Sequence, residues 1–344
     1  MATNLPPSSW ADARLHVVTG KGGTGKTTVA AALALTLASL GRRVLIAEVE
    51  GRGGISQAFD VPPLPDQERL VLKVHGGGEV WGLAVEAKAA LLEYLSIFYR
   101  LGRAGAALEK IGAIDFATTI APGVRDVLLI GKVYEAVGRQ VDQGRSSGGP
   151  ASGAPEWAYD AVVLDAPPTG RVAHFLNVNS EVADLARVGP IRSQADSITR
   201  MLRSGTCVVH LTTLLEEMPV QETIDAVADL SAIGVPVGAL IVNQAREEVF
   251  SPATAAAVHT DQVDHDAIAA VLERHRLPAD EAVVSGLLAQ GRGHLERIAV
   301  EDRALESLTR LGHPIVVLPH VWGEPDEGLV RVLAQHLAEQ GLWS

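Results

Sequence analysis

The chain has 344 residues, a mass of 36.2 kDa and a formal net charge of −12, from 41 acidic and 29 basic side chains. This acidic balance, without any run of lysines or arginines, argues against a surface that binds nucleic acid. The single cysteine, Cys207, excludes an internal disulfide and a cysteine-built structural zinc site. Because Cys207 lies in an apolar run, we expect a buried thiol.

The N-terminal segment has neither the basic region nor the apolar region of a signal peptide. We expect residues 1–13 to form a disordered arm and residues 14–344 to form one domain. The longest apolar helical run, residues 29–40, is too short to span a bilayer. These features predict a cytoplasmic protein, with peripheral attachment at a membrane as the alternative.

Apolar runs that predict strands alternate with helical patterns along the chain. Several are rich in Val, Ile and Leu throughout, which is typical of strands buried on both faces of a parallel sheet. The alternation predicts an α/β fold with a doubly wound, mostly parallel sheet. The predicted strands are residues 14–19, 43–49, 81–85, 159–165, 206–212, 237–243 and 315–318.

Two stretches, residues 86–139 and 172–204, are helical without strands and predict an inserted helical subdomain. Residues 142–155 are rich in Gly, Ser and Pro and predict a flexible loop. Residues 246–267 are polar and poorly periodic, so we expect an irregular excursion there. Apolar faces in the helical subdomain could line a groove for a client, but ordinary core packing is the favoured interpretation.

The segment from Lys21 to Thr28 (K-G-G-T-G-K-T-T) lies between the first predicted strand and a helical pattern. It satisfies G-x-x-x-x-G-K-[ST], in which backbone N–H groups and a helix N-terminus surround phosphate oxygens. Lys26 would contact the β- and γ-phosphates, and the Thr27 hydroxyl would ligate Mg²⁺. The sequence therefore predicts a site for ATP and Mg²⁺. The predicted binding residues of this segment are Gly20, Gly22, Gly23, Thr24, Gly25, Lys26, Thr27 and Thr28.

A second element of the predicted nucleotide site is the strand predicted over residues 159–165, which ends in Asp165. A carboxylate at this position is typical of a Walker B strand, where it orients Mg²⁺ together with the hydroxyl of Thr27. The next residues, A-P-P-T-G, resemble a switch segment, and the Gly170 amide is predicted to bond the γ-phosphate.

Lys21 resembles the first lysine of the deviant Walker A class, which is shared by the ArsA, MinD, ParA and nitrogenase-iron-protein ATPases. The segment D-A-P-P-T-G-R from Asp165 to Arg171 is similar to the D-T-A-P-T-G-H element of the ArsA family. Glu222-Thr223 and Val242-Asn243-Gln244 also resemble family elements. Together these elements cover most of residues 14–330 in family order, and they look most like the bacterial ArsA-like anion-transporting ATPases, which are often encoded as pairs of paralogues.

This resemblance implies a P-loop NTPase of the SIMIBI class that works as a dimer, either a homodimer or a heterodimer with a paralogue. Lys21 would act catalytically by reaching the partner's nucleotide, and Lys26 and Asp165 would act on the chain's own. The family's adenine contacts fall on Asn243, Leu318 and Pro319.

Switch I departs from the family pattern D-P-A-H-x-L-S-D-x-F. The chain carries Glu50 where the family has the aspartate that orients the attacking water, and the Pro-Ala-His that follows is missing. Glu50 can still accept a hydrogen bond from water, so we expect slow hydrolysis. Glu48 lies on the same face of the predicted strand and is the alternative.

The leading hypothesis is a Mg²⁺-dependent ATPase in which ATP closes a dimer and reshapes a helical surface that binds a client or a membrane protein. One alternative is a nucleotide-switched, hydrolysis-poor subunit of a heterodimer with a paralogue. The other is a MinD/ParA-like positioning ATPase, although the C-terminal helical pattern has a single arginine. The absence of further cysteines disfavours arsenite binding.

Overall fold

A computed structural model of the chain describes residues 10–49, 53–91, 122–141, 156–178, 190–323, 326–341 and 343. Its centre is an eight-stranded sheet with the order β3-β4-β2-β5-β1-β6-β7-β8. Every neighbouring pair is parallel except β3 and β4. The strands are β1 Leu15–Gly20, β2 Arg43–Val49, β3 Arg69–Lys73, β4 Glu79–Val85, β5 Ala161–Asp165, β6 Cys207–Thr213, β7 Val237–Ala245 and β8 Ile315–Pro319.

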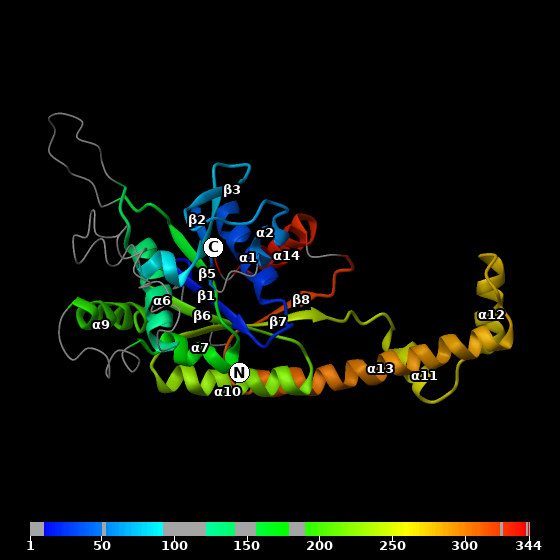
Figure 1. The fold of residues 1–344 in the computed structure, drawn as a ribbon. Coiled ribbons are helices and arrows are strands. Elements are labelled where there is room, and N and C mark those ends of the chain that lie inside the picture. Colours follow the sequence, from blue (N-terminus) through cyan, green and yellow to red (C-terminus); the bar gives the residue numbers. More distant parts are fainter. Residues whose placement is uncertain are drawn as a thin grey trace.

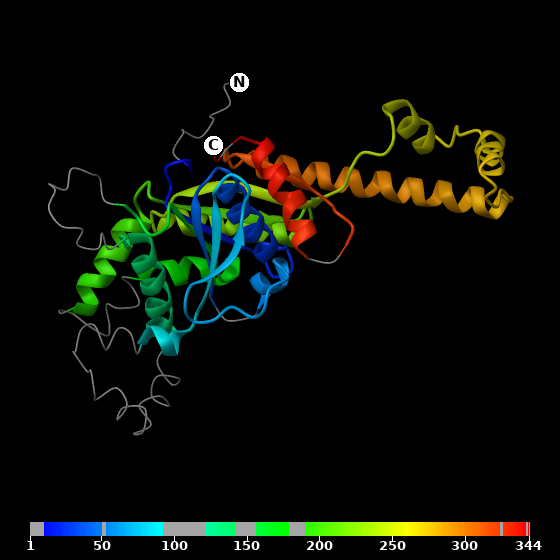
Figure 2. The ribbon, with the colours of Figure 1, turned by 90° about the horizontal axis from the view of Figure 1, so that it is seen from above.

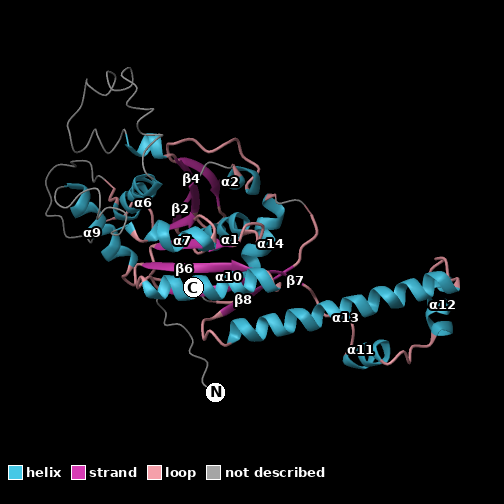
Figure 3. Ribbon diagram, turned by 60° about the horizontal axis from the view of Figure 1, so that its bottom comes forward, coloured by secondary structure: helices cyan, strands magenta, loops and turns pink. Residues whose placement is uncertain are grey.

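Helices cover both faces of this sheet (Figures 1 and 3). In chain order they are α1 Lys26–Ser39, α2 Gly54–Ala58, α6 Pro122–Gly138, α7 Thr169–Leu176, α9 Pro190–Leu202, α10 Glu217–Ala232, α11 Pro252–His259, α12 His265–Arg274, α13 Glu281–Thr309 and α14 Glu327–Glu339.

The core has two layers because successive side chains of each strand point to opposite faces. In β1, Leu15 and Val17 pack with α6, α7, α9 and α10, whereas Val18 packs with α1 and α14. Helix α1 is buried all around, as expected for a helix between a sheet and a second helix. The Thr36 hydroxyl donates to the Ala334 carbonyl at 3.1 Å and joins α1 to α14. The predicted doubly wound α/β fold is therefore confirmed.

Residues 10–13, which were expected to belong to a disordered arm, pack on the domain. Trp10 is 6% exposed and Ala13 is 2% exposed, and both belong to the layer that contains α1 and α14. Burying the Trp10 indole removes a large apolar surface from water, which holds this segment on the domain. Residues 1–9 lie outside the described residues.

Two buried histidines on neighbouring strands join the terminal segments to the sheet. His16 Nδ1 lies 3.2 Å from His210 Nε2, and the Ala239 N–H donates to His210 Nδ1 at 3.2 Å. His210 therefore carries its proton on Nε2 and donates it to His16. Burial lowers the pKa of His16 to about 4 and that of His210 well below its ordinary value. The rings of Trp10 and Trp343 pack against His210 with centroids 5.1 and 5.8 Å away.

Of the expected helical subdomain, the structure describes α6, α7 and α9, which pack on one face of the sheet. Most of the apolar side chains of α6 that could have lined a client groove are core residues: Ile130 and Val133 are fully buried and Leu129 is 2% exposed, whereas Leu128 is partly exposed. The remaining residues of the expected subdomain, 92–121 and 179–189, and the expected loop 142–155 lie outside the described residues.

The expected irregular structure is wrong for half of residues 246–267, which are helical. Helices α11, α12 and the first part of α13 form an arm that projects away from the sheet (Figures 1 and 2). Helix α13 has 29 residues and is about 43 Å long at 1.5 Å per residue. Its C-terminal part reaches the core through Leu308, which is fully buried. Helix α12 has no buried residue.

Candidate functional site

The predicted phosphate loop joins the end of β1 to the start of α1. Gly25, the residue before α1, is left-handed with φ 85° and ψ 25°, and among the described residues no side chain caps this helix. The first N–H groups of α1 therefore lack intrahelical partners and face the loop. Within the loop, the Thr24 hydroxyl donates to the Lys21 carbonyl at 2.8 Å. The result is an ordered turn with an open, electropositive helix start, which suits an anion.

The glycines at both ends of the loop are fixed by close neighbours. A Cβ built on Gly20 would lie 2.1 Å from the Thr212 carbonyl oxygen, and one built on Gly25 would lie 2.3 Å from Asn243 Nδ2. Asn243 itself donates from Nδ2 to the Thr24 carbonyl at 2.9 Å. The structure thus places the predicted adenine-side residue Asn243 against the phosphate loop, where its amide supports the loop backbone.

The two predicted magnesium ligands meet at the start of α1. The Thr27 hydroxyl donates to Asp165 Oδ2 at 2.6 Å, and Asp165 is 7% exposed. The chain just beyond Asp165 is held by Thr19, whose hydroxyl donates to the Pro167 carbonyl at 2.6 Å. Mg²⁺ is usually bound by one or two protein oxygen ligands together with substrate phosphates. A hydroxyl and a carboxylate beside an open helix N-terminus fit that requirement.

Glu50 lies outside the described residues, but Glu48 is described and lies beside the site. Glu48 is 3% exposed, pairs in register with Asp165 on the neighbouring strand, and accepts from the Gly54 N–H at 3.0 Å. Gly54 in turn packs on Thr27, since a Cβ on Gly54 would lie 2.8 Å from Thr27 Cγ2. Glu48 therefore anchors the start of α2 against the predicted magnesium ligands. The sequence marked it as the alternative to Glu50 because of strand alternation.

Lys21 is held within its own chain. Its ammonium lies 2.8 Å from Glu222 Oε1 on α10, and the other carboxylate oxygen accepts from the Thr169 hydroxyl at 2.9 Å. The hydrogen bond from Lys21 is the main reason that the pKa of Glu222 lies below its ordinary value. Glu222 matched a family element in the sequence, but nothing in the pattern indicated this contact.

The remaining predicted residues differ in their access to the site. Gly170 is exposed near the start of α7, and a Cβ built on it meets nothing within 4 Å. Leu318 is fully buried in the core, so its side chain is not available to a nucleotide. Pro319 is partly buried at the end of β8 and pairs in register with Ala245 of β7.

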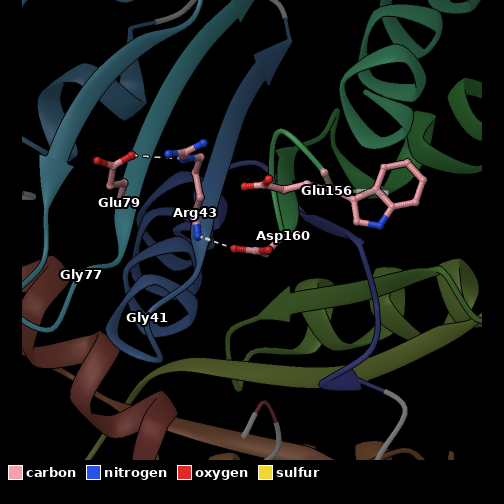
Figure 4. A pocket seen from close by; sticks show the side chains of 7 residues that line it. Gly41, Arg43, Gly77, Glu79, Glu156 and Asp160 are labelled. Carbon is pink, nitrogen blue, oxygen red and sulfur yellow. Dashed lines mark hydrogen bonds and ion pairs between the residues drawn. The ribbon is translucent and has the colours of Figure 1, made fainter. Parts of the chain in front are cut away.

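A separate polar pocket of about 440 Å³ opens at the amino ends of β2 and β4 (Figure 4). Two of its carboxylates have partners on Arg43: Arg43 Nε lies 3.2 Å from Glu79 Oε2, and the Arg43 backbone N–H donates to Asp160 Oδ2 at 2.7 Å. Ligands of open α/β sheets bind at the carboxyl ends of the strands, where the phosphate loop lies. This pocket is therefore not part of the candidate site.

Several known proteins are similar to this chain in sequence. A family model described as anion-transporting ATPase matches residues 13–212. ATPase BagA of Mycobacterium tuberculosis (strain ATCC 25618 / H37Rv) is 46% identical over 336 residues, which cover 98% of this chain and 96% of that protein. The "Putative arsenical pump-driving ATPase" of Chlorobaculum tepidum is 24% identical over 272 residues, which cover 67% of this chain and 61% of that protein.

The chain belongs to the anion-transporting ATPase family. It is an ATP hydrolase with the α/β fold of P-loop NTPases, as its phosphate loop and its Asp165-terminated strand indicate. The resemblance to the ArsA family is confirmed. Among the described helices of this ATPase, none combines the length and the apolar character that crossing a bilayer requires.

Proposed function

We propose that the chain is a Mg²⁺-dependent ATPase in which ATP binding closes a dimer and changes a helical surface that binds a client or a membrane-protein partner. The observation that supports this most strongly is the 2.6 Å contact between Thr27 and Asp165 at the start of α1. It brings the P-loop hydroxyl and the Walker B carboxylate to the place where a phosphate-bound Mg²⁺ would be held.

The chain's own residues bind and orient the substrate in this proposal. The first N–H groups of α1 receive phosphate oxygens, and Lys26 supplies a positive charge to the β- and γ-phosphates. Mg²⁺, when bound, neutralises the charge that develops on the phosphate oxygens during transfer to water. Glu50, or Glu48 two residues earlier in the chain, accepts a hydrogen bond from the attacking water.

Single-turnover hydrolysis of Mg·ATP tests the assignment of the carboxylates. Glu50→Gln removes a water-orienting carboxylate and should slow the chemical step by about 10²-fold or more, within the range of general-base contributions. Glu48→Gln serves as the matched variant, because each substitution removes one negative charge and the two positions are two residues apart. If Glu50→Gln hydrolyses at the wild-type rate and Glu48→Gln does not, the role belongs to Glu48.

A second candidate is a nucleotide-switched subunit that hydrolyses poorly and relies on a paralogue. The unusual switch I sequence E-G-R-G-G-I-S, with Glu50 in place of Asp, favours it. The same single-turnover assay decides between the two. Wild-type hydrolysis no faster than that of ATP alone in buffer would favour the binding subunit, whereas measurable wild-type turnover that neither Gln substitution reduces would remove both carboxylates from the mechanism.

Dimer closure is tested separately by sedimentation of the purified chain with Mg²⁺ and a non-hydrolysable ATP analogue, with ADP as the control. We expect the analogue to shift the chain to a dimer and Lys21→Ala to abolish the shift, since Lys21 would contact the partner's nucleotide. A wild-type chain that stays monomeric with the analogue would contradict homodimer closure. Addition of a paralogous subunit then tests the heterodimer.

A further inference from the structure

One carboxylate joins two parts of the site that lie far apart in sequence. Glu222 on α10 contacts Lys21 of the phosphate loop through Oε1 at 2.8 Å and Thr169 of α7 through Oε2 at 2.9 Å. Thr169 is the first residue of α7, four positions after the predicted magnesium ligand Asp165. Helix α7 also packs against α10. A change at Lys21 can therefore reach α7 through a single side chain.

Lys21 has two alternative anionic partners. In the structure it is paired with Glu222, and the side chains of Lys21 and Glu222 are 29% and 33% exposed. A half-open ion pair of this kind is weak, because water and salt screen it. A triphosphate carries several negative charges and competes strongly for an ammonium group on the phosphate loop.

We propose that Glu222 is a positioning residue that holds Lys21 and α7 together until a triphosphate replaces Glu222 as the partner of the Lys21 ammonium. When Lys21 leaves, the neutral Thr169 hydroxyl is the one partner that Glu222 keeps among the described residues. A carboxylate without its cation is better solvated by water, so the contact between α10 and the first turn of α7 weakens. Helix α7 then gains freedom to rearrange behind Asp165. The inference rests on the proposed function, because Lys21 must end on a phosphate group.

The geometry distinguishes this role from a purely structural one. A structural ion pair would stabilise the fold equally with any nucleotide bound. A competing partner instead lowers the affinity for triphosphate specifically, because the γ-phosphate supplies the extra charge that draws Lys21. The ratio of the dissociation constants for ADP and for the ATP analogue therefore reports the role.

Three variants separate the contacts. Glu222→Gln removes the charge that holds Lys21 but keeps an oxygen for the Thr169 hydroxyl. Thr169→Val removes the link to α7 and leaves the pair with Lys21 intact. Glu217→Gln is the matched control, because Glu217 is exposed in the first turn of the same helix and its loss changes the net charge equally.

Calorimetric titration with a Mg²⁺-bound non-hydrolysable ATP analogue and with Mg·ADP gives the first readout. We expect Glu222→Gln to tighten binding of the analogue by about 1.5- to 5-fold, the range of half-exposed ion pairs, and to leave ADP binding unchanged. Thr169→Val and Glu217→Gln should keep the wild-type ratio. An unchanged ratio in Glu222→Gln would overturn the proposal.

Hydrogen exchange of the peptide that spans α7 gives the second readout. In the wild type, the analogue should increase exchange in α7, and Thr169→Val should show increased exchange before any nucleotide is added. Exchange in α7 that is identical with and without the analogue would also overturn the proposal. Both readouts are taken at chain concentrations at which sedimentation shows the dimer with the analogue, because Lys21 would contact the partner's nucleotide. A failure of dimer closure appears in sedimentation, whereas an unchanged ratio in a chain that does dimerise is a failure of the role of Glu222 alone.

Discussion

Substitution of Gly20 by alanine should damage both the fold and the nucleotide site. A Cβ at this position would lie 2.1 Å from the Thr212 carbonyl oxygen and 2.8 Å from the Thr24 hydroxyl. Gly20 and Thr212 pair in register on β1 and β6, so the obstacle is backbone within a parallel ladder in the centre of the sheet. Ordinary contact requires the two strands to separate by about 1 Å or more at the point where the phosphate loop begins.

Overpacking of a close-packed interior costs about 1–3 kcal/mol, and the upper end applies where the neighbour is backbone. We therefore expect Gly20→Ala to lower the free energy of unfolding by about 3 kcal/mol. Because the phosphate loop starts at Gly20 and the Thr24 hydroxyl must also move, the affinity for Mg·ATP should fall as well.

Urea titration followed by circular dichroism measures the first effect and calorimetry measures the second. Gly22→Ala is the matched control in the same loop, since a Cβ on Gly22 meets nothing within 4 Å. Its free energy of unfolding should stay within about 0.5 kcal/mol of the wild type. A Gly20→Ala chain as stable as the control would refute the close approach of β1 and β6 at this position.

Three further predictions concern buried groups. Because burial lowers the pKa of His16 from 6.5 to about 4, the free energy of unfolding should fall by about 3 kcal/mol as the pH drops from 6.5 towards 4. In urea titrations, the free energy of unfolding of His16→Phe should depend less steeply on pH across this range. An equal dependence on pH would contradict the burial of the pair with His210. Trp10→Ala should lower the free energy of unfolding by about 3–5 kcal/mol, measured by thermal or urea unfolding. Trp322 is 89% exposed, so Trp322→Ala should lower it by less than about 0.5 kcal/mol. Equal losses would show that Trp10 is not part of the core. Burial raises the pKa of the Cys207 thiol to about 12, so Ellman's reagent at pH 8 should detect no thiol in the folded chain and one thiol after denaturation. Rapid reaction of the folded chain would contradict the burial of Cys207.

Strands of the sheet's centre were predictable because burial on both faces requires continuous apolar runs. Strand β2 has the predicted bounds, and the other predicted strands differ by one or two residues at their ends. Strand β3 was missed. It is a short edge strand whose partly exposed residues need no apolar run, and it pairs antiparallel with β4 through an irregular register.

The projecting arm was not predictable from hydrophobic periodicity. Helix α11 is rich in alanine and lacks a distinct apolar face, and α12 has no buried residue. A helix without an apolar face, such as α11, carries little of the periodic pattern that identifies amphipathic helices, and α12 begins only at His265, near the end of the expected irregular stretch. Capping residues were the available signal: the side chains of Ser251, Asp264 and Asp280 accept from the first N–H groups of the three arm helices.

The phosphate loop and Asp165 were predictable because their spacing in the sequence reflects contacts within single strand–turn–helix units. The pair of Lys21 with Glu222 was not, since these residues are 201 positions apart and only the sheet order brings α10 beside the loop. The hydrogen bond that Asn243 donates to the Thr24 carbonyl was likewise not predictable, since these residues are far apart in the chain. Contacts between distant elements depend on packing that no local pattern encodes.

The measurement that tests the central claim most directly is a double-mutant cycle on Thr27 and Asp165, scored as kcat/KM for hydrolysis of Mg·ATP. If the two side chains, 2.6 Å apart, act through one Mg²⁺, Thr27→Val and Asp165→Asn should each reduce kcat/KM strongly. The double variant should then lose little more than the more damaged single variant. Losses that multiply in the double variant, or single variants with wild-type turnover, would contradict a shared metal site at the start of α1.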